Sequence, residues 1–276
     1  MIGAEAARAP APGSRAALAF PGVYALLEGL GDMALLTRDA FRQLLARPPE
    51  WRLVVEQLDQ IGWRSLSIVN LTALFTGMVL ALQLGNYLAR FGAKMFVSRI
   101  VGMSLVREMG PVLTALMIGG RVGAGITAEL GSMAVTDQID AVRALGASPV
   151  RNLVVPRLAA ILVMLPVLTI IGDLVGVLGD LVGVLGGLFI SVTELRVGAD
   201  FYLNSLIQVL LLGDVASGIG KSFFFAYFIG IIACRNGLGT TGGADGVGRA
   251  TTATVVVASI TVLVSDFFLT KLFLLT

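Results

Sequence analysis

Four charged side chains, Arg107, Glu108, Lys221 and Asp266, stand inside long apolar stretches of this 276-residue chain. A charge at bilayer depth is costly unless it is paired or hydrated, so such residues mark a binding or transport pathway by default. One interpretation is an ion-pair set between helices, with Lys221 matched to Glu108 or Asp266. The other is a cavity whose basic groups meet an anionic head group. Arg107 would then bind phosphate through its planar guanidinium, and Lys221 would act as a point charge.

Two further acids, Asp173 and Asp180, lie in a duplicated heptad. Gly172–Leu178 reads GDLVGVL, and Gly179–Leu185 repeats it. Because seven residues are nearly two helical turns, the duplication returns the same helix face, and its glycines form a stripe that lets helices approach closely. This pattern favours a packing stripe over a proton- or cation-binding role for the two acids.

The composition is that of an integral membrane protein. Hydrophobic residues make up 56% of the chain and charged residues 14%, with a mean hydropathy of +0.89. A soluble domain is about a quarter charged, so one water-soluble core does not explain this apolar excess. The net charge of +2, with scattered basic residues, argues against nucleic-acid binding. Histidine, the commonest metal ligand, is absent, so we expect neither a metal nor a cofactor in this chain.

The pattern along the chain predicts an all-α protein with about five transmembrane helices and an N-terminal interfacial amphipathic helix. We expect a disordered leader over 1–21, interfacial or elbow helices over 22–64, and a transmembrane domain over 65–276. Val23–Ala46 carries apolar residues at helical spacing, and Trp51–Arg64 is a second short amphipathic piece. The five expected spans are Ser65–Ala89, Ile100–Gly120, Leu158–Thr193, Asp214–Cys234 and Ala250–Thr270. We also expect a short interfacial piece at Phe201–Leu212 and a glycine-rich loop at Arg235–Arg249.

A polar insert over 121–157 separates the second and third expected spans. The distribution of basic residues predicts a cytoplasmic N-terminus, an external C-terminus and a cytoplasmic insert. As a helix, the insert would present a polar face and an apolar one, ending at Gly146 and Pro149. It is either an ordinary surface helix or a helix that seats in a groove on a cytosolic partner. The polar face holds Glu129, Ser132, Thr136, Asp140 and Arg143, and the apolar face holds Leu130, Ala134, Ala141 and Leu145.

Two nucleotide-like motifs lack the context that their chemistry needs. Gly237–Gly242 fits G-x-G-x-x-G but follows an expected membrane helix instead of a strand. Gly218–Ser222 resembles the end of a phosphate loop, but the glycine that the motif requires is Val215. If ATP drives this protein, we expect another subunit to bind it.

An ordered set of strings resembles the MlaE/YrbE-type permeases of Mce-associated ABC transporters, over roughly Trp51–Leu274. The set comprises Arg107–Pro111, Gly120–Gly123, Thr127–Met133, Gln138–Ala141, Leu145–Gly146, Val155–Arg157, Arg249–Thr252 and Asp266–Phe267. Two features depart from the family: Asp137 stands where many relatives carry glutamate, and the duplicated heptad looks like an insertion.

The resemblance implies a non-catalytic, homodimeric permease subunit in the bacterial inner membrane, with its C-terminus in the periplasm. It would move phospholipids between that membrane and an Mce-protein route to the outer membrane, maintaining outer-membrane lipid asymmetry. The implied partners are a cytosolic ABC ATPase that binds ATP, a STAS-domain protein and a periplasmic Mce-domain protein. Ala128–Gly146 would hold the cytoplasmic coupling helix. The implied lipid-cavity residues are Arg107, Glu108, Lys221 and Asp266, and the implied ATPase-coupling residues are Glu129, Met133, Asp137, Asp140 and Arg143.

Two other classes of function compete with this interpretation. An ion- or proton-coupled secondary transporter would use Asp173, Asp180 and Asp266, but no inverted repeat is evident in the sequence. A membrane scaffold that transports nothing leaves the charges inside the spans with packing as their only role.

Overall fold

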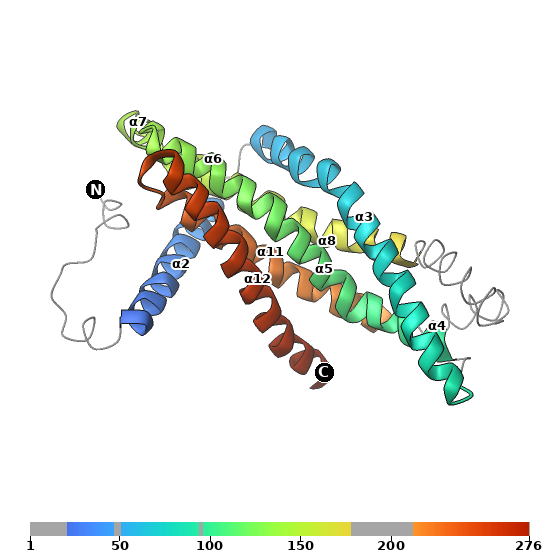
Figure 1. Cartoon of the computed structure of the whole chain (residues 1–276). Coiled ribbons are helices and arrows are strands. Elements are labelled where there is room, and N and C mark those ends of the chain that lie inside the picture. The colour runs from blue at the N-terminus through green and yellow to red at the C-terminus, as the bar shows by residue number, and fades with distance from the viewer. Residues whose placement is uncertain (1–20, 47–50, 94–95, 178–211, 276) are drawn as a thin grey trace.

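The computed structural model describes residues 21–46, 51–93, 96–177 and 212–275, and within these ranges every regular element is helical (Figure 1). Three short π-helical turns, labelled η, interrupt the α-helices. In chain order the elements are α2 (Pro21–Ala46), α3 (Trp51–Arg90), α4 (Val97–Ser104), η2 (Leu105–Met109), α5 (Gly110–Ile118), η3 (Gly119–Gly123), α6 (Ala124–Val135), α7 (Gln138–Ala144), η4 (Val150–Val154), α8 (Val155–Val177), α11 (Leu212–Leu238) and α12 (Gly243–Leu275).

Five helical runs are long and apolar enough to cross a membrane. A crossing needs about 20 residues at about 1.5 Å per residue, and the shortest of the five has 24. The prediction of an all-α protein with five such helices is therefore confirmed, and the chain is a multi-pass membrane protein. The runs are Trp51–Leu88, Arg99–Val135, Val150–Asp173, Gly213–Leu238 and Gly243–Phe273.

The core lies where α8 packs against α3 and α11, with α6 and α12 on the other side of α11. Phe225 and Ile229 of α11 and Leu165 of α8 have no exposed surface. α8 and α11 approach closely at Gly230 of α11, where a Cβ atom would lie 2.8 Å from the Leu158 side chain and 2.9 Å from that of Ile161. Because apolar lipid gives helices little reason to associate, close packing at small residues stabilises the bundle.

The N-terminal amphipathic helix α2 docks on α11 through a mixed side, since Met33, Leu36 and Ala40 pack with the core beside two polar contacts. Asp32 accepts a hydrogen bond from Arg235 at 3.0 Å, and the hydroxyl groups of Thr37 and Tyr227 are 2.7 Å apart. Leu27 and Phe41 remain exposed on other sides of the helix. The helix is confirmed, and an interfacial position for its exposed apolar side chains stays a prediction.

Several expected boundaries are wrong. Trp51–Arg64 is not a separate piece, since α3 continues unbroken to Arg90. The helix of the second span does not end at Gly120 but continues through η3 and α6 to Val135. Arg121 and Ser65, which marked two of the expected boundaries, instead bond to each other, with the Arg121 guanidinium donating to Ser65 Oγ at 2.5 Å. A polar residue that finds a partner on the neighbouring helix does not end its own helix.

The glycine-rich loop is shorter than expected, because tertiary contacts also decide where these helices end. Only Gly239–Gly242 lies between α11 and α12, and Gly243–Arg249 already belongs to α12. Glycine lowers helix propensity by about 1 kcal/mol per residue, and tertiary packing overrides such a preference. Residues 1–20 of the expected leader, the second heptad copy with Asp180, and most of the expected piece at Phe201–Leu212 lie outside the described residues, whereas Pro21 already belongs to α2.

Candidate functional site

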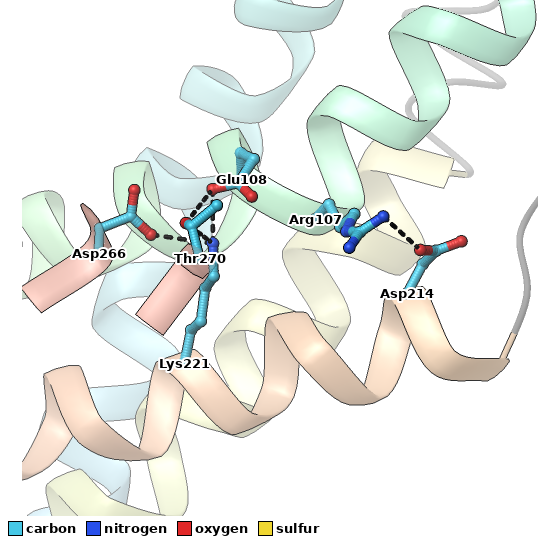
Figure 2. A network of polar contacts seen from close by, with 6 residues as sticks. All are labelled: Arg107, Glu108, Asp214, Lys221, Asp266 and Thr270. Atoms are coloured by element: carbon cyan, nitrogen blue, oxygen red, sulfur yellow. Dashed lines mark hydrogen bonds and ion pairs between the residues drawn. The ribbon is translucent and has the colours of Figure 1, made fainter. Parts of the chain in front are cut away.

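The π-turn η2 places two charged residues in the first third of the second span, Arg99–Val135. A π-turn widens a helix by one extra residue and is frequent at functional sites. Arg107 and Glu108 both lie in this turn, and Pro111 follows it in the first turn of α5. The two adjacent side chains point to different parts of α11 (Figure 2).

Glu108 points toward Lys221, which forms the centre of a buried polar cluster. Lys221 Nζ lies 2.5 Å from Glu108 Oε2, 2.7 Å from Thr270 Oγ1 and 3.1 Å from Asp266 Oδ1. The Thr270 hydroxyl in turn donates to Glu108 Oε2 at 3.1 Å. An ammonium group has three donors, and here each faces one oxygen on η2 or α12 (Figure 2). The structure therefore contains the predicted inter-helix ion pairs and joins Lys221 to both acids.

Arg107 pairs with an acid that sequence reasoning did not assign to the site. Its Nη1 atom lies 3.5 Å from Asp214 Oδ1, near the start of α11 (Figure 2). The Asp214 side chain is 9% exposed, against 26% for Arg107. Asp214 and Lys221 are seven residues apart, so they share one helix face. The spacing of seven could have identified Asp214 as a site residue from the sequence. In the same way, the spacing of four from Asp266 could have identified Thr270.

The described acid of the duplicated heptad, Asp173, lies close to the same region. It is buried in α8, and its carboxylate occupies the space that a Cβ at Gly110 would fill. It also borders a cavity of about 20 Å³, the size of about one water molecule. At the neighbouring Gly172 a Cβ would lie 3.2 Å from Val69. This close contact supports the packing interpretation of the glycine stripe at that position.

The predicted coupling region is not one helix. α6 ends at Val135, Asp137 adopts a left-handed conformation with φ of 58°, and the short α7 follows. Gly146, with φ of 76°, ends α7 as expected. The apolar face predicted across the region is wrong: Leu130 is fully buried on α6, whereas Leu145, beyond the turn, is 86% exposed.

The five predicted coupling residues are divided by this turn. On α6, Glu129 bonds to Arg157 of α8 at 3.0 Å, and Met133 packs against the core. On α7, Arg143 bonds to Asp140 at 2.6 Å, and both side chains are exposed. α7 forms one tip of the molecule, at the end opposite α4 (Figure 1).

Buried hydroxyl groups tie α6 to the helices that carry the polar cluster. The Thr127 hydroxyl lies 2.8 Å from that of Thr254 on α12 and 3.1 Å from the Ala233 carbonyl oxygen on α11. Asn236 also donates to the Thr254 hydroxyl at 2.9 Å. At Gly237 a Cβ would lie 2.6 Å from that of Leu130, so only glycine allows this approach. α6 is thus joined to α11 and α12 by buried hydrogen bonds and by close packing.

In the part of the chain that the structure describes, no three His, Cys, Asp or Glu side chains are grouped as metal ligands. The polar cluster holds acids and bases in close pairs without a nucleophile activated by a base. Its geometry suits the binding and release of a polar group inside the membrane.

Comparisons with known proteins agree with one another. The model of the permease MlaE family matches residues 54–272. A probable ABC transporter permease protein of Rickettsia bellii is 40% identical over 248 residues, which cover 90% of this chain and 93% of the relative. One of Synechocystis is 40% identical over 86% of this chain and 88% of its own length. The chloroplastic protein TRIGALACTOSYLDIACYLGLYCEROL 1 of Arabidopsis thaliana is 32% identical over 95% of this chain and 74% of the relative.

Proposed function

This chain belongs to the MlaE permease family, and we propose that it moves phospholipids as the membrane subunit of an ABC transporter. It is a multi-pass, non-catalytic permease subunit. The observation that carries the lipid proposal is the polar cluster around Lys221, Glu108 and Asp266, which lies on the membrane helices η2, α11 and α12. A lipid head group is a polar ligand that naturally reaches such a depth while its chains stay in hydrocarbon.

The name of the Arabidopsis relative also supports this proposal, because that name includes the name of a lipid, trigalactosyldiacylglycerol. We propose that this chain acts in the bacterial inner membrane and exchanges phospholipid with a periplasmic Mce-domain protein. That route leads to the outer membrane and maintains its lipid asymmetry. The N-terminus and α7 would then face the cytoplasm, and the C-terminus the periplasm.

Energy would come from a cytosolic ABC ATPase to which a STAS-domain protein binds. The sequence supports a separate ATP-binding subunit, because the phosphate-loop motif lacks its first glycine at Val215. We propose that α7 and the end of α6 dock on this ATPase. The hydrogen bonds of Thr127 would pass the resulting movement to α11 and α12, and so to Lys221.

The working unit would be a homodimer. α12 presents a long row of exposed apolar side chains, among them Ile260 and Phe267 at 56% and 68% exposure. Such a face suits either lipid or a second copy of the chain. Two copies would surround a shared lipid cavity with the residues of Figure 2 near its lining.

The experiment replaces Arg107 with Ala in the full chain, expressed with its neighbouring genes. The amount of copurified phospholipid and the outer-membrane barrier to detergents are then measured. We expect both to fall, because Arg107 is the partly exposed cation of the site. Arg38→Ala on α2 is the matched control, since Arg38 pairs only with the adjacent Asp39 among the described residues. Unchanged lipid and an unchanged barrier in Arg107→Ala would refute the head-group role.

A further inference from the structure

The residues of Figure 2 do not balance in charge. Arg107 and Lys221 supply two positive charges, whereas Glu108, Asp214 and Asp266 supply three negative ones. Asp214 pairs with Arg107, so Lys221 is shared between the carboxylates of Glu108 and Asp266. Inside a membrane an uncompensated charge is strongly unfavourable. The site as described is therefore short of one positive group.

Two buried polar atoms of α11 also lack hydrogen-bond partners among the described residues. Asp214 and Ser217 are both 7% exposed, and among the described residues Asp214 Oδ2 and Ser217 Oγ have no hydrogen-bond partner. Ser217 lies between Asp214 and Lys221 on α11, at the spacing that puts all three on one side of the helix. A buried polar atom without a partner calls for an explanation, such as a ligand. A ligand with a cationic donor for the carboxylates and an acceptor for the Ser217 hydroxyl fits both observations.

Accessibility decides which groups a ligand meets first. Lys221 has no exposed surface, so a phosphate approaching the cluster does not reach it. The side chains of Glu108 and Asp266 are 31% and 21% exposed, and that of Arg107 is 26% exposed. The outer edge of the site thus presents two carboxylates beside one guanidinium.

We propose that this edge selects zwitterionic, amine-bearing phospholipids over anionic ones. The lipid phosphate binds Arg107, whose guanidinium has five donors. The lipid ammonium binds Glu108 and Asp266, the two carboxylates that share Lys221, so a zwitterionic head group adds no net negative charge to the site. An anionic head group without an amine adds a further negative charge and is disfavoured by the same carboxylates. The inference rests on the proposed function, because it names the lipid class of that site.

The test uses the full chain in vesicles of equal parts phosphatidylethanolamine and phosphatidylglycerol at pH 7. The protein is extracted, and its bound lipids are quantified by mass spectrometry. We expect the ratio of bound phosphatidylethanolamine to bound phosphatidylglycerol to be about three, against one in the vesicles, the size typical of a partly exposed ion pair. Glu108→Gln and Asp266→Asn should each bring the ratio close to one. Glu56→Gln makes the same change on the exposed part of α3 and should keep the preference.

The outcomes separate the two proposals. Wild-type protein that binds no phospholipid refutes the proposed function and this inference with it. Wild-type protein whose bound lipids mirror the vesicles overturns only the amine preference, as expected if protons neutralise the carboxylates instead. A preference that persists in both Glu108→Gln and Asp266→Asn overturns it too. The wild-type ratio needs no variant to fold, so the test stands even if one variant is unstable.

Discussion

Two pairs of opposite charges in this molecule differ mainly in where they lie. Lys221 and Glu108 meet inside the helix bundle, and Lys221 has no exposed surface. Arg143 and Asp140 meet at a similar distance on α7, but their side chains are 54% and 67% exposed. Water and salt screen the second pair, whereas in the first pair Lys221 is wholly buried and Glu108 is only partly exposed.

Ion pairs of the same chemistry therefore have different roles in the two places. Removing one partner of a buried pair strands a charge and is strongly destabilising. An exposed pair is worth about 0 to 1 kcal/mol, so its presence says little about stability. The charges of the Lys221 cluster should therefore matter for both folding and ligand binding, and those of α7 for recognition of a partner.

The largest expected effect comes from Lys221→Met, which leaves Glu108 and Asp266 without their shared cation. We expect a loss of about 3 kcal/mol in the free energy of unfolding, measured as a lower unfolding midpoint in detergent. Adding Glu108→Gln to the same chain removes one stranded acid and should recover part of the loss. Equal stability of Lys221→Met and the wild type would show that the cluster is hydrated, and the contrast with α7 would disappear.

The next prediction concerns the packing that connects the two regions. Gly237→Ala places a Cβ 2.6 Å from that of Leu130, so α6 must move away from α11. We expect a loss of about 2 kcal/mol, as is typical of overpacking, together with weaker coupling between ATP hydrolysis and lipid movement. Gly125→Ala in α6 is the control, because nothing lies within 4 Å of its added methyl group. If both variants unfold at the wild-type midpoint, α6 and α11 are not held as closely as described.

The contrast between buried and exposed charges also explains which features of the fold could be predicted from the sequence. Long apolar runs predict five membrane helices because that signal is local and repeats along each helix. The ends of these helices depend on contacts that are distant in the sequence. Arg121 was interpreted as the end of a span, yet its guanidinium donates a hydrogen bond to Ser65, 56 residues earlier, and the helix continues. Hydropathy alone does not contain that information.

The site shows the same division between local and distant signals. Charges inside apolar runs identified Glu108, Lys221 and Asp266, since an unpaired charge there is unfavourable. Asp214 was missed because it stands at the first turn of α11, where an acid is ordinary. The turn at Asp137 was missed because a non-glycine residue rarely adopts positive φ. The polar face predicted from Glu129 to Arg143 is interrupted by the turn at Asp137.

A smaller effect should follow from Thr270→Val, which removes the hydroxyl between Lys221 and Glu108 without changing any charge. The loss of buried hydrogen bonds predicts a decrease of about 1 kcal/mol in stability. Thr261→Val on the same helix is the control, since that exposed hydroxyl bonds only to the Val257 carbonyl oxygen among the described residues. A drop as large as that of Lys221→Met would mean that Thr270, and not the ion pair, holds the cluster together.

The smallest effect on stability is expected for Asp140→Lys, which replaces an exposed ion pair by two like charges three residues apart. The free energy of unfolding should change by about 0.5 kcal/mol or less. We nevertheless expect copurification of the ATPase to be lost, because the reversed charge sits at the tip that is proposed to dock. Asp39→Lys on α2 breaks a similarly exposed pair with Arg38 and should leave the complex intact. An intact complex with Asp140→Lys would remove α7 from the docking surface. A complex lost without a loss of stability would show that exposed charges serve recognition here, whereas buried ones hold the fold.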